Sequence, residues 1–263
     1  MKKFVIRCFC FSLISSYIFQ TQNLNALVPF YYLPSSKHLK KESLSIGKSA
    51  YQLLYFGQIK DSLNLAKLAV KINKSDEKLW TILAESQIAN ELLEDALISL
   101  NKAESINSNR AELYFAKSTI YLQQSNIKDA KIALKKGLQI KPKQYRGLFQ
   151  LGNLFLMEKN YKNAIDEFDR ALLIKTDFWQ AINNIGLAYF ELDKIKLSIT
   201  YFKKAIAIEE NAEPLLALAS CLKNENLNEA ILLAKKALMI DPNYVDYQYR
   251  KEQLWGEKLQ YST

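Results

Sequence analysis

Small side chains recur along this sequence at a fixed interval of 34 residues. One series comprises Ser62, Ala96, Ala130, Ala164 and Ser198, and Ala230 follows after 32 residues. A second series of small residues lies seven residues after the first, and a third lies twelve residues before it. Because three series share one period, the chain consists of repeated units, and a period of about 20–50 residues is typical of solenoids and other repeat proteins.

Each unit is predicted to be a pair of antiparallel helices. Two helices approach closely only where both present small side chains, and large apolar residues such as Tyr114, Leu148 and Ile182 recur between the small ones at helical spacing. The chain has only seven Gly and five Pro in 263 residues, which favours helices over an architecture with many turns. One hairpin cannot bury its apolar face alone, so we expect an all-α fold in which consecutive hairpins stack.

The repeats resemble those of the tetratricopeptide repeat (TPR) family. The unit at residues 145–178 matches the family pattern at Leu148, Leu151, Gly152, Phe155, Tyr161, Ala164, Phe168 and Ala171. Six units lie between Ser43 and Tyr244. Lys117 replaces the apolar residue expected in the third unit, and the sixth unit is two residues short. The resemblance implies a TPR solenoid of about six stacked helix-turn-helix repeats, which spans residues 43–244.

The first 26 residues have the layout of a secretory signal. Lys2, Lys3 and Arg7 precede an apolar run at residues 9–19, which is shorter than the ~20 residues that a spanning helix needs. We therefore predict export to a periplasm or thylakoid lumen, with cleavage before Leu27. An uncleaved membrane anchor is the alternative.

Two further segments flank the repeats. Residues 27–42 contain Pro29 and Pro34 and are expected to form an extended lead-in, with a disordered linker as the alternative. Residues 245–263 are expected to form a C-terminal capping helix and tail, because the end of a solenoid exposes an apolar face. Trp255 and Gly256 interrupt the helical pattern of this tail.

Three stretches are similar to exported TPR proteins of cyanobacteria. They are residues 27–34, 177–186 and 254–259. Some cyanobacterial and plastid TPR proteins assist the assembly of photosystems. The resemblance thus implies a membrane-associated role in assembling a membrane complex, such as a photosynthetic one.

The composition argues against catalysis. His38 is the only histidine, there are three Cys, and the sequence has no Gly-rich phosphate loop and no nucleophile elbow. We therefore predict a non-enzymatic protein with no metal, no cofactor and no small-molecule substrate. The net charge of +9 falls to +6 without Lys2, Lys3 and Arg7, and no Lys or Arg recurs at one repeat position. Nucleic acid is thus an unlikely partner, although a cytoplasmic RNA-binding helical-repeat protein remains the alternative function.

The resemblance also implies a binding site, because the first helices of TPR units line a concave groove. The candidate groove residues in the fourth and fifth units are Arg146, Phe149, Gln150, Asn153, Met157, Asn183, Asn184, Leu187 and Phe190. Their Asn amides could clamp the main chain of an extended peptide or helix from a partner protein, and the apolar members could hold its side chains. Alternatively, these Asn residues are only solvated or satisfy neighbouring backbone groups. A scaffold that binds segments of other proteins is the function predicted.

Overall fold

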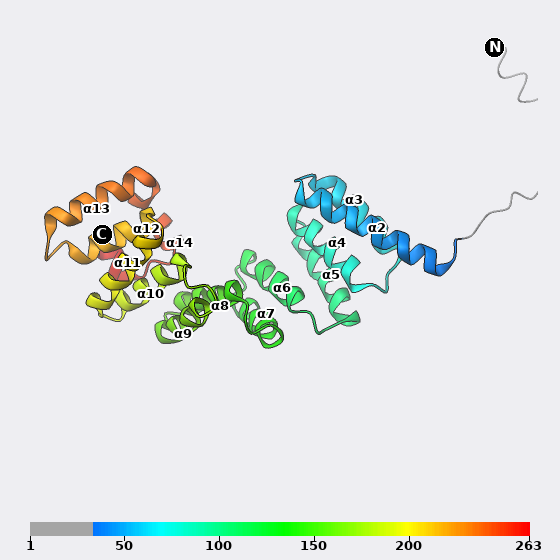
Figure 1. Ribbon diagram of the computed structural model, residues 1–263, viewed down its shortest axis with the longest axis horizontal. Helices are drawn as coiled ribbons and strands as arrows, with labels where there is room; N and C mark the ends of the chain where they lie inside the picture. Colours follow the sequence, from blue (N-terminus) through cyan, green and yellow to red (C-terminus); the bar gives the residue numbers. More distant parts are fainter. Residues whose placement is uncertain (1–33) are drawn as a thin grey trace, which may run out of the picture. The chain divides into compact units, whose positions relative to one another are not determined.

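The computed structural model describes residues 34–263, and all regular structure in this part is helical (Figure 1), as predicted. The signal predicted for residues 1–26 lies outside the described residues. Residues 42–263 form one compact unit, and the packing below concerns this unit alone. Among the described helices, none combines the length and the apolar character needed to cross a membrane.

Six consecutive helical hairpins make up most of the described chain. They are α2 (Ser36–Tyr55) with α3 (Ile59–Ile72), α4 (Glu77–Ala89) with α5 (Leu93–Ile106), α6 (Ala111–Gln123) with α7 (Ile127–Ile140), α8 (Tyr145–Met157) with α9 (Tyr161–Leu172), α10 (Trp179–Glu191) with α11 (Ile195–Ile208), and α12 (Ala212–Leu222) with α13 (Leu227–Ile240). From α3 onward, each helix contacts the next one along the chain. Hairpins therefore stack in sequence order.

The small residues of the 34-residue period lie where helices touch. Ala96, Ala130 and Ala164 are fully buried. A Cβ atom added to Gly152 would lie 2.4 Å from Cε1 of Phe168, a buried ring on the partner helix of the same hairpin. Such a distance is below van der Waals contact, so the close approach of α8 and α9 requires glycine at this position.

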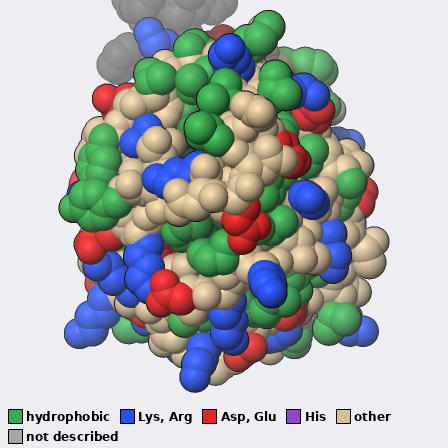
Figure 2. Space-filling model, turned by 90° about the vertical axis from the view of Figure 1, so that its left-hand side faces the viewer, with side chains coloured by type: hydrophobic (Ala, Val, Ile, Leu, Met, Phe, Trp, Pro, Cys, Tyr) green, Lys and Arg blue, Asp and Glu red, His purple; other side chains and the backbone are tan. Residues whose placement is uncertain are grey.

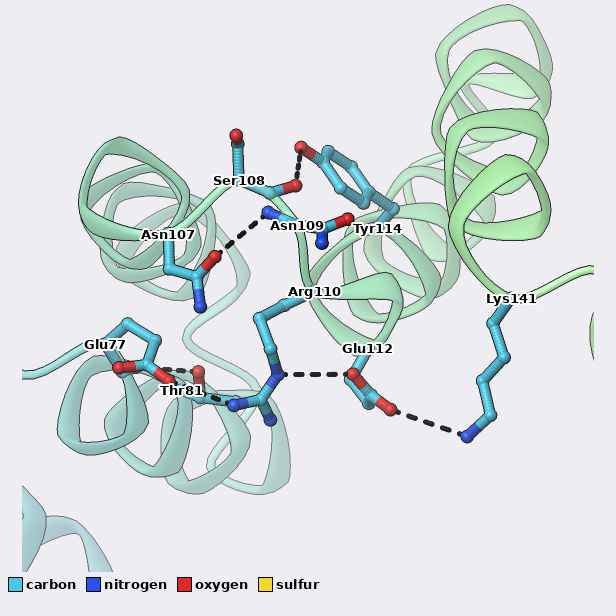
Figure 3. Close-up of polar contacts among 9 residues, drawn as sticks. All are labelled: Glu77, Thr81, Asn107, Ser108, Asn109, Arg110, Glu112, Tyr114 and Lys141. Atoms are coloured by element: carbon cyan, nitrogen blue, oxygen red, sulfur yellow. Dashed lines mark hydrogen bonds and ion pairs between the residues drawn. The ribbon is translucent and has the colours of Figure 1, made fainter.

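A chain of ion pairs joins the second and third hairpins (Figure 3). Arg110, just before α6, donates to Glu77 Oε1 over 3.0 Å and to Glu112 Oε2 over 3.4 Å, and Lys141 Nζ lies 3.6 Å from Glu112 Oε1. These side chains are partly exposed, so each pair contributes at most about 1 kcal/mol. Their main effect is to fix the orientation of the loop between α5 and α6.

Lys117 occupies an apolar repeat position and is only 7% exposed. Its ammonium pairs with the carboxylate of Glu104, which also accepts from Lys136 Nζ over 2.8 Å and lies 2.9 Å from the Tyr114 hydroxyl. Partial burial would raise the pKa of Glu104, but the hydrogen bonds from Lys117, Lys136 and Tyr114 outweigh it and lower the pKa to about 2. This paired network explains how a lysine is accommodated at the α5–α6 junction.

The second half of the predicted lead-in differs from the expectation, and residues 27–33 lie outside the described part of the chain. Helix α2 begins at Ser36, so residues 36–42 are helical rather than extended. Neither Gly nor Pro interrupts the chain between Pro34 and Gly47, and Ser35 Oγ accepts from the backbone N–H of His38 at the helix start. A side-chain acceptor at this place satisfies a free N–H of the first turn, which favours an early start of the helix.

The C-terminal tail also differs from the single helix expected. It consists of the 3₁₀ turn η2 (Pro242–Val245), α14 (Tyr247–Glu252) and α15 (Glu257–Ser262). Leu254 has a φ of +66°, which ends α14 and redirects the chain. Only η2 packs on α13, whereas α15 contacts α10 and α12.

The last hairpin leaves apolar side chains exposed at the end of the stack. Leu232 and Met239 of α13 are 68% and 87% exposed. Figure 2 faces this end of the protein and shows hydrophobic side chains interspersed with Lys and Arg. The interspersed cations limit the size of any continuous apolar patch.

Candidate peptide-binding site

The first helices of the hairpins, α2, α4, α6, α8, α10 and α12, form the face that we call the inner face. The predicted residues of α8 are accessible there, since Arg146 and Met157 are exposed and Phe149, Gln150 and Asn153 are half-buried. Those of α10 are all buried, namely Asn183, Asn184, Leu187 and Phe190. The inner face is thus accessible at α8 and covered at α10.

The three candidate Asn side chains bond to one another. Asn184 Nδ2 donates to Asn153 Oδ1 over 2.9 Å, which links α10 to α8, and Asn183 Nδ2 donates to Asn184 Oδ1 over 3.3 Å. These amides are therefore bonded to one another rather than to solvent alone or to neighbouring backbone groups. Asn183 Oδ1 is the exception, because it is buried and has no hydrogen-bond partner among the described residues.

The candidate Phe rings are packed rather than free. The Phe149 ring centroid lies 4.8 Å from that of Phe178 and 5.6 Å from that of Phe168, so this ring fills the junction between hairpins. Phe190 belongs to a buried cluster that includes Leu216 and Trp255. Phe149 is thus packed although half-buried, and Phe190 is buried, so neither ring is a free apolar surface on the groove.

The segment that covers α10 is the C-terminal tail of the same chain. Trp255 is 4% exposed and Leu259 is fully buried, and both belong to the cluster that contains Leu187 of α10 and Leu216 of α12. Helix α15, which begins two residues after Trp255, contacts both α10 and α12. The tail thus lies on the inner face and places two large apolar side chains there.

Polar groups of α10 hold the backbone of the tail. The Glu191 carboxylate accepts from the N–H of Leu259 over 3.1 Å and from the N–H of Lys258 over 3.5 Å. Lys258 Nζ in turn donates to the carbonyl of Glu191 over 2.9 Å and pairs with Asp193. A Cβ atom on Gly256 would lie 2.2 Å from Glu191 Cδ, so glycine lets the two segments approach. Specific main-chain bonds of this kind are typical of a bound peptide.

Helix α12 supplies a second carboxylate. Trp255 Nε1 donates to Glu213 Oε1 over 3.2 Å. Burial raises the pKa of Glu213 to about 7, an effect that hydrogen bonds from Trp255 and Asn183 partly oppose. Farther along α12, Ser220 Oγ lies 3.0 Å from Thr263 Oγ1, and Lys223 Nζ donates to the carbonyl of Ser262. Contacts between α12 and the tail therefore continue as far as Thr263.

The inner face is accessible in the earlier units. Tyr51 and Tyr55 of α2 are more than half exposed, and Met157 of α8 is half exposed. Between them, α4 presents Glu85, which is half-buried and has no hydrogen-bond or ion-pair partner among the described residues. Burial raises the pKa of this carboxyl group. This surface, which we call the open inner face, offers an acceptor and apolar side chains.

The described residues provide little for catalysis. They contain no group of three or more His, Cys, Asp or Glu that could hold a metal ion. Cys221 is buried, and burial raises the pKa of its thiol to about 11, so the reactive thiolate is scarce at neutral pH.

Sequence reasoning missed the role of the tail. Glu191 and Leu259 are 68 residues apart, and the repeat pattern carries no information on contacts outside the repeats. The signal that could have revealed it is the interruption at Trp255 and Gly256, since a Trp followed by Gly is a poor choice for an exposed capping helix. In the structure, Trp255 is buried and Gly256 lies against Glu191.

Comparison with known proteins agrees with this architecture. Residues 111–144 and 180–211 match the family model of the tetratricopeptide repeat. Among solved structures, PilF of Pseudomonas aeruginosa gives a TM-score of 0.68 at 17% identity, covering 81% of this chain and 99% of that one. YrrB, described as a TPR protein with an unusual peptide-binding site, gives 0.59 at 20% identity, covering 71% and 97%. The MamA protein gives 0.58 at 22% identity, covering 65% and 92%.

A comparison with curated protein sequences gives no match. The identities to the solved structures are low, so these structures show the fold alone. Together with the family-model matches in the third and fifth hairpins, they confirm the predicted architecture. Two of its hairpins match the tetratricopeptide repeat model, and its stacked hairpins have the fold of a TPR solenoid.

Proposed function

We propose that this protein is a non-enzymatic scaffold that binds segments of partner proteins on its inner face. The observation that carries the proposal is the C-terminal tail, because the inner face of α10 and α12 already holds a peptide segment through main-chain bonds and buried side chains. The open inner face is built from the equivalent first helices of the earlier hairpins, and no segment of the described chain covers it. The peptide-binding site described for YrrB supports the same class of ligand.

The open inner face offers chemistry that a partner segment could use. Glu191 accepts main-chain N–H groups from the tail, and Glu85 is a half-buried carboxyl group without a partner among the described residues. The Glu85 carboxyl oxygens are not fully buried, so a bound N–H or cation of a partner segment would take the place of water at this acceptor. Tyr51, Tyr55 and Met157 would contact apolar side chains of the partner.

The cellular setting belongs to the same proposal. The signal-like residues 1–26 support export, or retention at a membrane if they are not cleaved. The similarity of residues 27–34, 177–186 and 254–259 to exported cyanobacterial TPR proteins supports a role in assembling a membrane complex, such as a photosynthetic one.

The test compares two sets of three substitutions, each of which removes exposed apolar side chains. The first set is Tyr51→Ala, Tyr55→Ala and Met157→Ala on the open inner face. The control set is Leu68→Ala, Ile98→Ala and Ile132→Ala, which are exposed residues of the second helices α3, α5 and α7. Proteins captured from the source membranes by each full-length variant are identified by mass spectrometry, and circular dichroism monitors folding.

We expect the inner-face variant to lose specific partners that the wild type and the control variant retain. Equal capture by all three proteins would refute binding at the open inner face. A cytoplasmic protein that cross-links mainly to RNA would refute the scaffold proposal as a whole.

A further inference from the structure

The C-terminal tail does more than cover the last hairpin, because it also makes specific contacts of the kind that a bound peptide makes. A capping element needs only to cover the last hairpin, yet α15 reaches back past it to α10 of the preceding hairpin. The tail also forms hydrogen bonds with side chains of both helices. These side chains are Glu191 on α10 and Glu213 and Ser220 on α12. The site therefore recognises particular features of the tail.

Three of these features are specific to side-chain type. The Trp255 side chain is buried, and its indole N–H donates to Glu213. This position therefore suits a large ring that carries an N–H donor, which is the indole of tryptophan. Residue 256 must be Gly while Glu191 keeps its position. Residue 259 is fully buried and apolar.

A fourth feature is the positive charge of Lys258, which lies between Gly256 and Leu259 in the sequence. Lys258 pairs with Asp193 and donates to the Glu191 carbonyl, whereas Glu257 points to Lys159 in an exposed ion pair of 2.9 Å. An exposed pair contributes little to binding energy, so position 257 is less restricted. The features together define the pattern Trp-Gly-x-Lys-Leu.

We propose that the inner face of α10 and α12 is a binding site for partner segments with the pattern Trp-Gly-x-Lys-Leu, and that residues 255–259 of this chain fill the site until such a segment displaces them. This inference rests on the proposed function, because it assigns a ligand class to one part of the inner face. It adds that this part binds only by exchange with the tail.

The size of the competition follows from the linkage between the tail and the site. A segment tethered by a short linker acts at an effective concentration on the order of 1 mM. A free peptide with a Kd of about 100 μM would then bind the wild type roughly tenfold more weakly than a protein whose tail no longer fits.

The experiment measures the fluorescence anisotropy of a labelled peptide with the sequence of residues 253–263. It is titrated with the full-length wild type, with a Trp255→Ala, Leu259→Ala double variant, and with Tyr261→Ala as the control. Tyr261 lies in the same tail but is 81% exposed. We expect the double variant to bind at least about tenfold more tightly than the wild type and the control, and a peptide with Ala in place of Trp not to bind.

A second measurement covers the case in which the double variant does not fold. Hydrogen exchange is followed in the wild type at the backbone N–H groups of Lys258 and Leu259, with and without about 1 mM peptide carrying a heavy-isotope label. Faster exchange at these two groups supports displacement of the tail. Unchanged exchange, or no binding by a folded double variant, would overturn the inference and leave the tail as a cap.

The two proposals fail in different ways. The peptide experiment uses α10 and α12, whereas the capture experiment uses Tyr51 and Tyr55 of α2 and Met157 of α8. Met157 lines a cavity together with Trp255 and Gly256 of the tail, so the Tyr51→Ala, Tyr55→Ala variant is also tested without Met157→Ala. Peptide exchange without partner loss in the inner-face variant would refute binding at the open inner face and leave the inference on the tail standing. Partner loss in that variant without peptide exchange would refute only the inference on the tail.

Discussion

Replacing Glu213 with Gln should stabilise the protein at pH 8 and flatten the dependence of its stability on pH. The Glu213 side chain is partly buried and accepts from Trp255 Nε1, and the pKa of Tyr244 is raised by burial and by the charge of Glu213, which places this tyrosine nearby. Glutamine keeps the size and the acceptor oxygen of the side chain. Its NH₂ group is also a donor that could satisfy Asn183 Oδ1.

The expected magnitude follows from the pKa. Burial raises the pKa of Glu213 from 4.5 to about 7, and each unit corresponds to about 1.4 kcal/mol. The folded state binds the proton more tightly than the unfolded chain does. The contribution to stability is therefore complete below pH 4.5 and is lost as the pH rises through 7, which amounts to at most about 3 kcal/mol.

The assay is urea unfolding of full-length proteins between pH 4.5 and 8.5, monitored by circular dichroism. The free energy of unfolding of the wild type relative to Glu213→Gln should fall by up to about 3 kcal/mol over this range. Glu225→Gln changes an exposed glutamate just after α12 and is the control. Parallel pH profiles for the wild type and Glu213→Gln would refute the reasoning, because then the buried carboxyl group does not change its protonation on folding in this window.

Three further predictions concern other parts of the chain. Gly152→Ala should lower the free energy of unfolding by about 1–3 kcal/mol in urea, because the new Cβ atom clashes with the buried Phe168 ring; unchanged stability would show that the α8–α9 contact adapts. Because the folded-state pKa of Glu104 is about 2, the wild type should lose up to about 3 kcal/mol relative to Glu104→Gln as the pH falls from 4.5 to 2, and a pH-independent difference would contradict this. N-terminal sequencing of the protein from its native source should begin at Leu27, whereas a start at Met1 would refute signal cleavage.

The hairpins could be predicted because their packing is local and periodic. A small residue such as Ala130 or Ala164 recurs every 34 residues, and each is fully buried against the neighbouring helix. The contacts between two helices of one hairpin depend on residues close in sequence, so a repeated pattern carries the information. The same logic located the first helices and hence the inner face.

The repeat pattern could not predict which side chains of the inner face are packed or which part of this face the tail covers. Whether Phe149 points into the groove depends on its side-chain rotamer and on Phe168 and Phe178, which belong to the next segments along the chain. The cover over α10 depends on a contact between Glu191 and Leu259 across 68 residues. Neither contact changes the repeat period, so a family pattern assigns these positions to an open groove.

The balance between the tail and a competing segment depends on two opposing terms. Helices α14 and α15 have six residues each, and isolated helices shorter than about 12–15 residues are marginal in water, so the order of the tail depends on its contacts with α10 and α12. Its link to the repeats includes Leu254 at a φ of +66°, a conformation that costs on the order of 1–3 kcal/mol. A partner segment avoids this strain but lacks the effective concentration of a tethered tail. If the tail exchanges as proposed, the strain offsets part of the advantage of tethering, so a partner with the same side chains competes at a lower concentration than an unstrained tail would require.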